Sequence, residues 1–511
     1  MDSFIPLYII LPLAAAFLIP IIGRFVKVFQ KSISFIVFLI LTCMCVAGFF
    51  TWDRETIVYA VGGWMPVDNI PIAIYLVFDG FSIILLSVIN LIALLTTIYS
   101  IAYIEKYTAE NNFYALLCIM VAGMNGVVLT GDLFNMYVFL EIAAISSYAL
   151  VAFGVEKEEL EASFKYQVLG GLASLLLLLG IGLIYWSTGT LNIADLSVLL
   201  ESYTGNKIII FIQLILIAGF GMKAAMVPFH AWLPDAHSSA PSPISSMLSG
   251  VLIKAIGIYI LIRLFFNMFA ISHEIALTIT ILGVISMVTG GFLAIGQWDY
   301  KRLLAYSSIS QVGYIILGVG IGMLVMANNG KQEIAALAIF GGLFHLINHA
   351  VIKGLLFMTA GAVEHVTGIR NLNMLGGLNK AMPVTSATSF TGSMAISGIP
   401  PFNGFFSKLI IIIAAAMAQY YLLAIIAALI SIITLAYFLK LQKNLFFGEP
   451  KINLDNLKKA PLAMQFSMVV LAVLCIVLSL LIIPGVREVI ITPAVNVLMD
   501  TSNYARAILG G

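Results

Sequence analysis

The sequence has few charged residues. Only 10% of its 511 residues are Asp, Glu, Lys or Arg, whereas soluble globular chains carry about 25%. Hydrophobic residues make up 61% of the chain and the mean hydropathy is +1.08. This composition excludes an ordinary soluble domain and predicts a membrane protein. The net charge of +1 is spread over short loops rather than gathered in a patch, which argues against nucleic-acid binding.

Motifs for redox or nucleotide chemistry are also missing. The sequence contains no phosphate-binding loop, no dinucleotide-binding glycine motif and no haem attachment motif. Its four cysteines, Cys43, Cys45, Cys118 and Cys475, form no C-x-x-C pair and fall inside apolar runs. We therefore expect no disulfide, no metal, no cofactor and no catalytic site in this chain. The sequence therefore shows no energy source of its own.

Apolar runs of about 20 residues, the length that crosses a bilayer, recur along the chain. About fourteen such runs begin near residues 4, 33, 77, 113, 133, 164, 208, 243, 272, 303, 334, 385, 421 and 464. They are continuously apolar, whereas the strands of a membrane barrel alternate. We predict an all-α polytopic membrane protein whose residues 1–511 form a single membrane domain. The first run lacks the basic segment and cleavage site of a signal peptide, so we expect it to be retained.

The basic residues predict an orientation in the cell membrane. Fifteen of the 25 Lys and Arg residues lie in or beside the loops that follow odd-numbered runs. The positive-inside rule places these loops on the inner side, and therefore both termini on the outer side. The fifteen residues are Arg24, Lys27, Lys31, Lys106, Lys157, Lys165, Lys301, Arg302, Arg370, Lys380, Lys440, Lys443, Lys451, Lys458 and Lys459.

Ionisable residues inside the apolar runs are the strongest functional indication. The runs contain four lysines and a glutamate: Lys223, Lys254, Lys353, Lys408 and Glu141. A lysine near the middle of a bilayer costs roughly 2.5–3.5 kcal/mol on insertion scales, and such residues commonly mark ion pathways. Burial favours the neutral form of a lysine, whereas a nearby carboxylate favours the charged form. Moving the carboxylate therefore switches the protonation state of the lysine. For Lys223, which lies nearer the end of its run, snorkelling to the surface is the alternative.

Two histidines extend this set. His345, His349 and Lys353 recur every four residues and so share one helix face. The alternatives are histidines satisfied by hydrogen bonds in the core and a His-x-x-x-His metal pair, which here lacks companion ligands. Asp79, near the start of the third run, is a further buried acid for which functional and structural interpretations are equally supported.

Prolines interrupt two of the runs close to a lysine. Pro228 follows Lys223, and Pro400 and Pro401 precede Lys408. Broken helices in corresponding positions of two halves indicate inverted repeats, although proline kinks without a function are the alternative. We predict two five-helix repeats, with helices 1–3 before them and helix 14 after them. The segments are 4–103, 113–268, 272–445 and 464–484.

These runs resemble the antiporter-like subunits shared by respiratory complex I, Mrp-type cation/proton antiporters and membrane-bound hydrogenases. The resemblance implies a fourteen-helix fold with a hydrated polar axis, with Glu141 and Lys223 as a coupled pair. It also implies Lys254 as the connecting site and Lys408 as the site in the second half. It rests on Glu141, on KAAMVPFHAWLPDAH from Lys223, on DYKRLLAYSSISQVGY from Asp299, on the His345, His349 and Lys353 column, and on GIPPFNGFFSK ending at Lys408.

The function that follows is a proton-translocating subunit of a redox-driven complex related to hydrogenases or complex I. A subunit of an Mrp-type Na⁺/H⁺ antiporter is the alternative. Both imply other membrane subunits as partners, and the first also implies peripheral redox subunits. Two other classes fit less well: a solute transporter needs one pocket rather than groups spread over five helices, and a structural anchor leaves the buried lysines unexplained.

Overall fold

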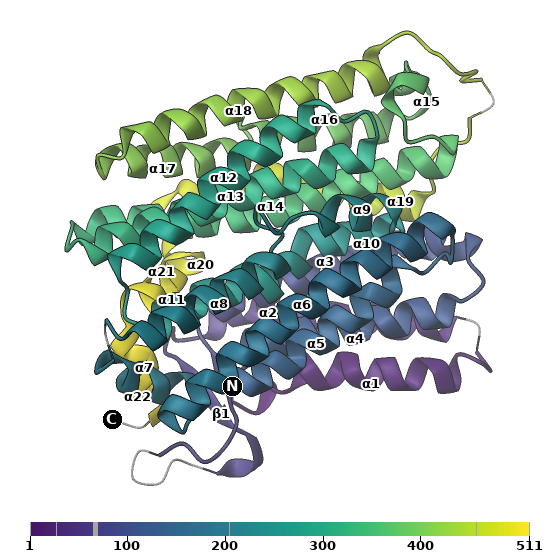
Figure 1. The fold of residues 1–511 in the computed structure, drawn as a ribbon. Helices are drawn as coiled ribbons and strands as arrows, with labels where there is room; N and C mark the ends of the chain where they lie inside the picture. The colour runs from purple at the N-terminus through teal and green to yellow at the C-terminus, as the bar shows by residue number, and fades with distance from the viewer. Residues whose placement is uncertain (1, 27, 65–69, 204, 456, 510–511) are drawn as a thin grey trace.

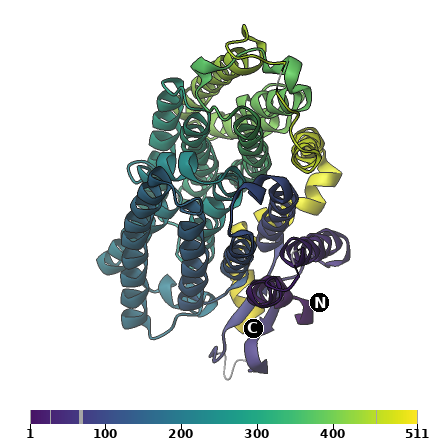
Figure 2. The same ribbon diagram turned by 90° about the vertical axis from the view of Figure 1, so that its right-hand side faces the viewer.

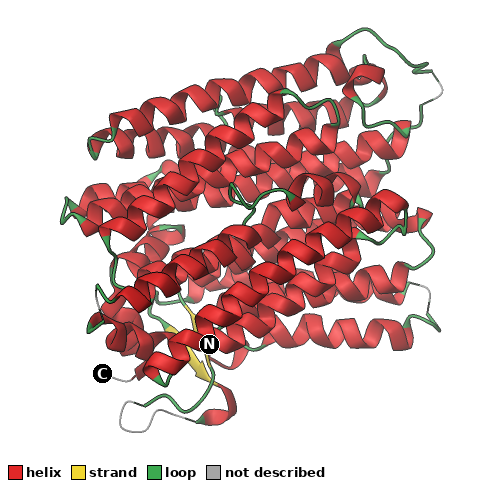
Figure 3. Cartoon of the chain, viewed as in Figure 1, coloured by secondary structure: helices red, strands yellow, loops and turns green. Residues whose placement is uncertain are grey.

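The computed structural model describes residues 2–26, 28–64, 70–203, 205–455 and 457–509. Lys27, one of the basic residues counted above, lies outside the described residues. The described chain is nearly all helical (Figures 1 and 3).

The helices fall into three groups along the chain. The first is α1 (Leu7–Ile22), α2 (Phe29–Thr51) and α3 (Gly80–Tyr103). The second is α4 (Glu110–Leu129), α5 (Leu133–Val151), α6 (Lys157–Thr188), α7 (Ile193–Glu201), α8 (Lys207–Lys223), α9 (Trp232–Ser239), α10 (Ser242–Met247) and α11 (Ile260–Asn267). The third is α12 (His273–Ile295), α13 (Tyr300–Ala327), α14 (Gln332–Thr367), α15 (Leu378–Ala381), α16 (Pro383–Ser397), α17 (Asn403–Met417), α18 (Tyr421–Gln442), α19 (Leu462–Val477), α20 (Pro484–Ile490), α21 (Thr492–Met499) and α22 (Thr501–Leu509).

The expected polytopic membrane architecture is confirmed. Within the described residues, eleven helices are long and apolar enough to cross a membrane, and the apolar helices α1 and α17 are shorter. The helices lie side by side, across the page in Figure 1 and end-on in Figure 2. Helix α13 is buried over most of its length, whereas only about a third of the residues in the apolar stretches of α2 and α18 are buried. The count of fourteen and the inverted repeats stay predictions.

One end of the bundle collects the basic loops. Helices α2, α4, α6 and α13 begin at this end, with Lys31, Lys106, Lys157 and Lys380 in or near its connections. We call it the basic end; it lies on the right of Figure 1.

A short sheet departs from the expectation of a purely helical chain. β1 (Ile57–Ala60) pairs antiparallel with β2 (Tyr75–Phe78), with Ile57 opposite Phe78. The strands lie at the end opposite the basic end (yellow in Figure 3). Both segments are rich in β-branched and aromatic residues and are far too short to cross a bilayer, which favours a hairpin in the polar interruption between α2 and α3.

Both expected helix breaks are present. Helix α8 ends at Lys223, before Pro228, and the chain resumes as α9 at Trp232. Helix α16 ends before Gly398, whose φ of +80° suits a glycine that closes a helix, and α17 resumes at Asn403. A proline has no N–H to give to the preceding turn, so neither helix continues unbroken.

A third irregularity was not expected from the sequence. The run between α10 and α11 is π-helical at Leu248–Leu252 and Lys254–Tyr259. Such widened turns are rare and often occur at functional sites, and Lys254 opens the second of them.

Candidate functional site

Glu141 and Lys223 meet inside the second group of helices. Glu141 projects from α5, and one of its oxygens lies 3.4 Å from Nζ of Lys223 at the end of α8. Ser174 of α6 lies between them: Nζ of Lys223 donates to its hydroxyl at 2.9 Å, and that hydroxyl donates to Glu141. Only 2% of the Lys223 side chain is exposed, against 24% for Glu141. Its ammonium therefore points at Glu141 and Ser174, rather than snorkelling to the surface.

Lys254 and Lys353 share a chain of polar groups. Nζ of Lys254 donates to the carbonyl of Ser249 at 2.5 Å, and the hydroxyls of Ser249 and Ser308 lie 2.8 Å apart. Ser308 donates to the carbonyl of Leu304, which also accepts from Nζ of Lys353 at 2.8 Å. Both lysines are fully buried. Two serine hydroxyls and a backbone carbonyl thus connect the π-helical stretch to α14.

The two histidines continue the axis along α14. Their rings lie 6.4 Å apart and nearly parallel. His345 has partners on both nitrogens, Ser407 at 3.0 Å and Gln311 at 3.1 Å. His349 is fully buried, and neither of its nitrogens has a hydrogen-bond partner among the described residues. It interacts electrostatically with Lys254, Lys353 and Lys408. A buried imidazole of this kind is normally satisfied by ordered water.

Lys408 lies beyond the histidines. Its Nζ donates to the carbonyl of Ile396, in the last turn of α16, at 2.7 Å and lies 4.7 Å from the centre of the Tyr314 ring. The last four carbonyls of a helix have no partner within the helix, so the break in α16 supplies an acceptor for this ammonium. Only 2% of Lys408 is exposed.

The structure thus gathers Lys254, Lys353, His349, His345 and Lys408 in one buried region, with the Glu141–Lys223 pair beside it. Where a Cβ on Gly257 would lie, the backbone nitrogen of Ala224 is 2.7 Å away. The helix end after Lys223 therefore touches the π-helical stretch that holds Lys254. Within the described part of the chain no side-chain hydrogen bond joins Lys223 to Lys254, so proton transfer between them requires bridging water.

Asp79 lies apart from this region. It caps the start of α3 through the backbone N–H groups of Phe81 and Ser82. Arg263 also donates to both of its oxygens, at 2.7 and 2.8 Å. This buried pair ties α3 to α11, which favours the structural interpretation.

Sequence reasoning missed the hydroxyl and amide groups between the ionisable residues. Ser174, Gln311 and Ser407 each hydrogen-bond an ionisable residue, whereas Ser249 and Ser308 link Lys254 to the Leu304 carbonyl that accepts from Lys353. Serine and glutamine are common in helices, and their roles depend on distances between helices. Ser407, directly before Lys408, and Ser249, five residues before Lys254, were close in sequence to a predicted site.

The chain is similar to known membrane proteins along most of its length. Residues 130–434 match the family described as NADH:quinone oxidoreductase/Mrp antiporter, TM, and residues 64–114 match NADH-Ubiquinone oxidoreductase (complex I), chain 5 N-terminus. The chain is 35% identical to NADH-quinone oxidoreductase subunit N of Desulforudis audaxviator, over 76% of this chain and 75% of that protein.

Two solved structures are similar over nearly the whole chain. One is an Mrp complex from Dietzia sp., with a TM-score of 0.89 and 28% identity over 100% of this chain and 99% of that one. The other is the membrane-bound sulfane sulfur reductase, an archaeal respiratory membrane complex, with a TM-score of 0.87 and 30% identity over 99% of both chains. The chain therefore belongs to the NADH:quinone oxidoreductase/Mrp antiporter family of antiporter-like membrane subunits.

Proposed function

We propose that this chain moves protons across the membrane as a subunit of a redox-driven complex. The observation that carries the proposal is the burial of Lys254, Lys353 and Lys408 inside the helix bundle. All three are almost fully buried, and among the described residues none has a carboxylate within ion-pair distance. An unpaired buried ammonium costs several kcal/mol unless it releases its proton. Buried amines that lack a carboxylate partner suit a relay that takes up and releases protons.

The Glu141–Lys223 pair acts as the switch in this proposal. While the carboxylate lies at 3.4 Å, it stabilises the charged form of Lys223. When Glu141 moves away, burial favours the neutral amine, and the proton passes toward Lys254. Ser174 bridges the two groups in the paired state, because its hydroxyl accepts from Lys223 and donates to Glu141. The route continues through Lys353, His349 and His345 to Lys408.

Partner subunits complete the site. Glu141 is 24% exposed in this chain alone, on a helix that crosses the membrane. A carboxylate facing lipid at that depth is unfavourable, so we expect another membrane subunit to cover it. We also propose that the basic end faces the cytoplasm, which places both termini outside.

The energy source distinguishes two candidates. Redox reactions drive the first, supported by the similarity to a respiratory reductase complex and to an NADH-quinone oxidoreductase subunit. The Na⁺/H⁺ antiporter candidate is favoured by the TM-score of 0.89 to a chain of an Mrp complex. Purification of the native complex separates them: peripheral redox subunits support the first, and small membrane subunits alone support the second.

Two substitutions test proton movement itself. Glu141→Ala and Lys223→Ala should abolish proton transport by the assembled complex in vesicles, because each removes half of the switch, while the amount of complex changes little. Lys207→Ala is the matched control, since Lys207 is exposed at the other end of the same helix, α8. Wild-type transport by both switch variants would remove the pair from the proton path.

A further inference from the structure

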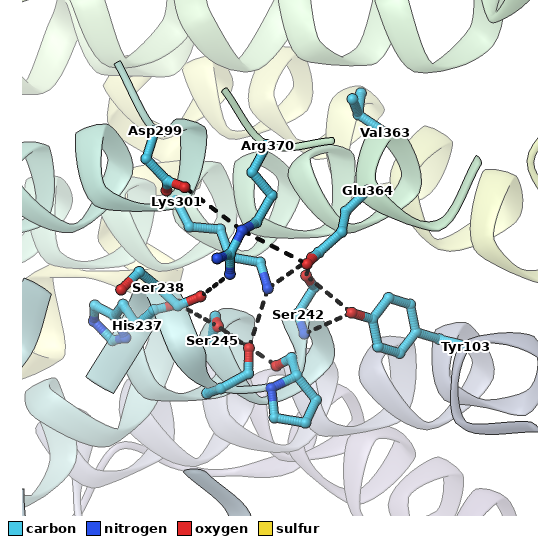
Figure 4. Close-up of polar contacts among 12 residues, drawn as sticks. Tyr103, His237, Ser238, Ser242, Ser245, Asp299, Lys301, Val363, Glu364 and Arg370 are labelled. Carbon is cyan, nitrogen blue, oxygen red and sulfur yellow. Dashed lines mark hydrogen bonds and ion pairs between the residues drawn. The ribbon is translucent and has the colours of Figure 1, made fainter. Parts of the chain in front are cut away.

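A second cluster of charged side chains lies at the basic end, outside the axis described above (Figure 4). Nζ of Lys301 lies 2.8 Å from Glu364 and donates to the carbonyl of Ala240 at 3.1 Å. Glu364 also accepts from Ser242 at 3.3 Å. Arg370 lies 3.8 Å from Glu364 and 3.5 Å from Asp299.

Local sequence explains why these groups meet. Asp299 caps α13 by accepting from the backbone N–H of Arg302, which places Lys301 in the first turn. Gly368, with a φ of +71°, closes α14 and leaves Glu364 in its last turn. Backbone hydrogen bonding from Tyr300 to the carbonyl of Arg370 holds the two helix ends together.

Exposure falls steadily from the rim of this cluster inward. The side chains of Arg370, Glu364 and Lys301 are 37%, 22% and 2% exposed. Among the described residues, Lys301 and Glu364 form an ion pair with one member at the surface and the other inside. A simple surface clamp would leave both partners exposed.

His237 lies between this cluster and the axis. Its carbonyl accepts from Ser245, which also donates to the carbonyl of Ala240, the partner of Lys301. The ring is fully buried, and neither nitrogen has a hydrogen-bond partner among the described residues. It interacts electrostatically with Lys353 and Lys254. Such an imidazole is normally satisfied by ordered water.

We propose that Glu364 is the proton-loading site of the basic end, with Lys301 as its positioning residue and His237 as the next acceptor. This inference rests on the proposed proton-transport function. A proton from bulk water binds the Glu364 carboxylate, and the neutral acid loosens its hold on the Lys301 ammonium. The proton then passes through water to a ring nitrogen of His237, and the carboxylate re-forms its pair with Lys301. The same steps in reverse release a proton.

Transport by the assembled complex in vesicles tests this assignment. Glu364→Gln keeps the shape of the side chain but cannot carry a proton, so transport should fall by about 100-fold or more. Glu364→Asp keeps a carboxylate and should retain much of the rate. Glu110→Gln is the matched control: Glu110 is 24% exposed at the basic end and pairs with Lys31, away from Lys301.

A sided infrared measurement separates a loading site from a structural clamp. Lowering the pH on the basic-end side alone should produce the carbonyl stretch of a protonated carboxylic acid, and Glu364→Gln should abolish that band. A structural ion pair in which the Glu364 carboxylate stays ionised gives no such band. Absence of the band would therefore overturn the proposal. If Glu364→Gln does not accumulate, His237→Phe keeps a ring beside Phe357 and removes both nitrogens. Wild-type transport by that variant would also overturn it.

Failure of this inference is distinguishable from failure of the proposed function. Glu141→Gln is measured in the same preparation. Loss of transport in Glu141→Gln with wild-type transport in Glu364→Gln rejects the loading site alone. Wild-type transport in Glu141→Gln rejects the proton path through the switch, and the loading site with it.

Discussion

Two buried ammonium groups of this protein, those of Lys408 and Lys254, are held by carbonyls that helix irregularities leave free. Lys408 donates to Ile396 in the last turn of the broken helix α16, and Lys254 donates to Ser249 in the π-helical stretch. A regular helix would have used those carbonyls internally. The irregular backbone and the lysines therefore act together, because carbonyls accept from an ammonium without fixing its charge as a carboxylate would.

Ser174 gives a test at the scale of one residue. Ser174→Ala removes the hydroxyl that joins Lys223 and Glu141 and leaves both short of a buried partner, at a cost of about 1–3 kcal/mol. Proton transport should slow by about tenfold or more, as measured in vesicles. Ser187→Ala, on the same helix, removes a hydroxyl that bonds only its own helix in the described contacts, and should leave the rate unchanged. Equal rates for the two variants would exclude Ser174 from the switch.

Ionisable site residues could be predicted from the sequence because charge in an apolar run is rare and unfavourable. Lys223, Lys254, Lys353 and Lys408 stood out for that reason, and the structure buries all four. Lys301 did not stand out, because it lies beside a loop. It was therefore counted only among the basic residues that predict the orientation in the membrane. Its burial depends on Glu364, which is 63 residues away in sequence and adjacent only after folding.

At the scale of elements, α12 and α13 approach closely through glycines. A Cβ on Gly313 would lie 2.3 Å from the backbone nitrogen of Met287, and one on Gly290 would lie 2.5 Å from that of Ser310. Small residues allow helices in a membrane to pack backbone against backbone. This packing fixes α13, which carries Lys301, Ser308 and Gln311 along its length.

A larger residue in this contact should separate the two helices. Gly313→Leu should lower the melting temperature and the yield of the protein, with an overpacking cost of about 1–3 kcal/mol or more. Gly171→Leu on α6 is the control, since nothing lies within 4 Å of the position of its Cβ. The two melting temperatures are compared in detergent. A value for Gly313→Leu equal to that of the control would show that the close approach is not needed.

Helix positions followed from the sequence because length and apolarity determine them in a bilayer. The prolines after Lys223 and before Lys408 also marked the breaks correctly. The π-helical stretch around Lys254 could not be predicted, since it contains no proline and its apolar pattern is continuous. The β1–β2 hairpin was missed because its strands have only four residues each.

At the scale of the whole molecule, polar groups extend from the Glu141–Lys223 pair through the centre to Lys408, and a separate cluster approaches them from the basic end. The surrounding helices bury this set in an apolar bundle. The chain is a membrane subunit of its family, and we expect a partner subunit to cover Glu141 where it is exposed. The central claim is that the buried lysines carry protons rather than hold the fold together.

Lys254→Met tests that claim most directly, in proton-transport and melting measurements on the same assembled complex. Methionine matches the length of the side chain and removes an unpaired buried charge, a change that is commonly neutral or stabilising by about 1–4 kcal/mol. We predict that proton transport is lost while the melting temperature is unchanged or higher. Wild-type transport by Lys254→Met would contradict the account.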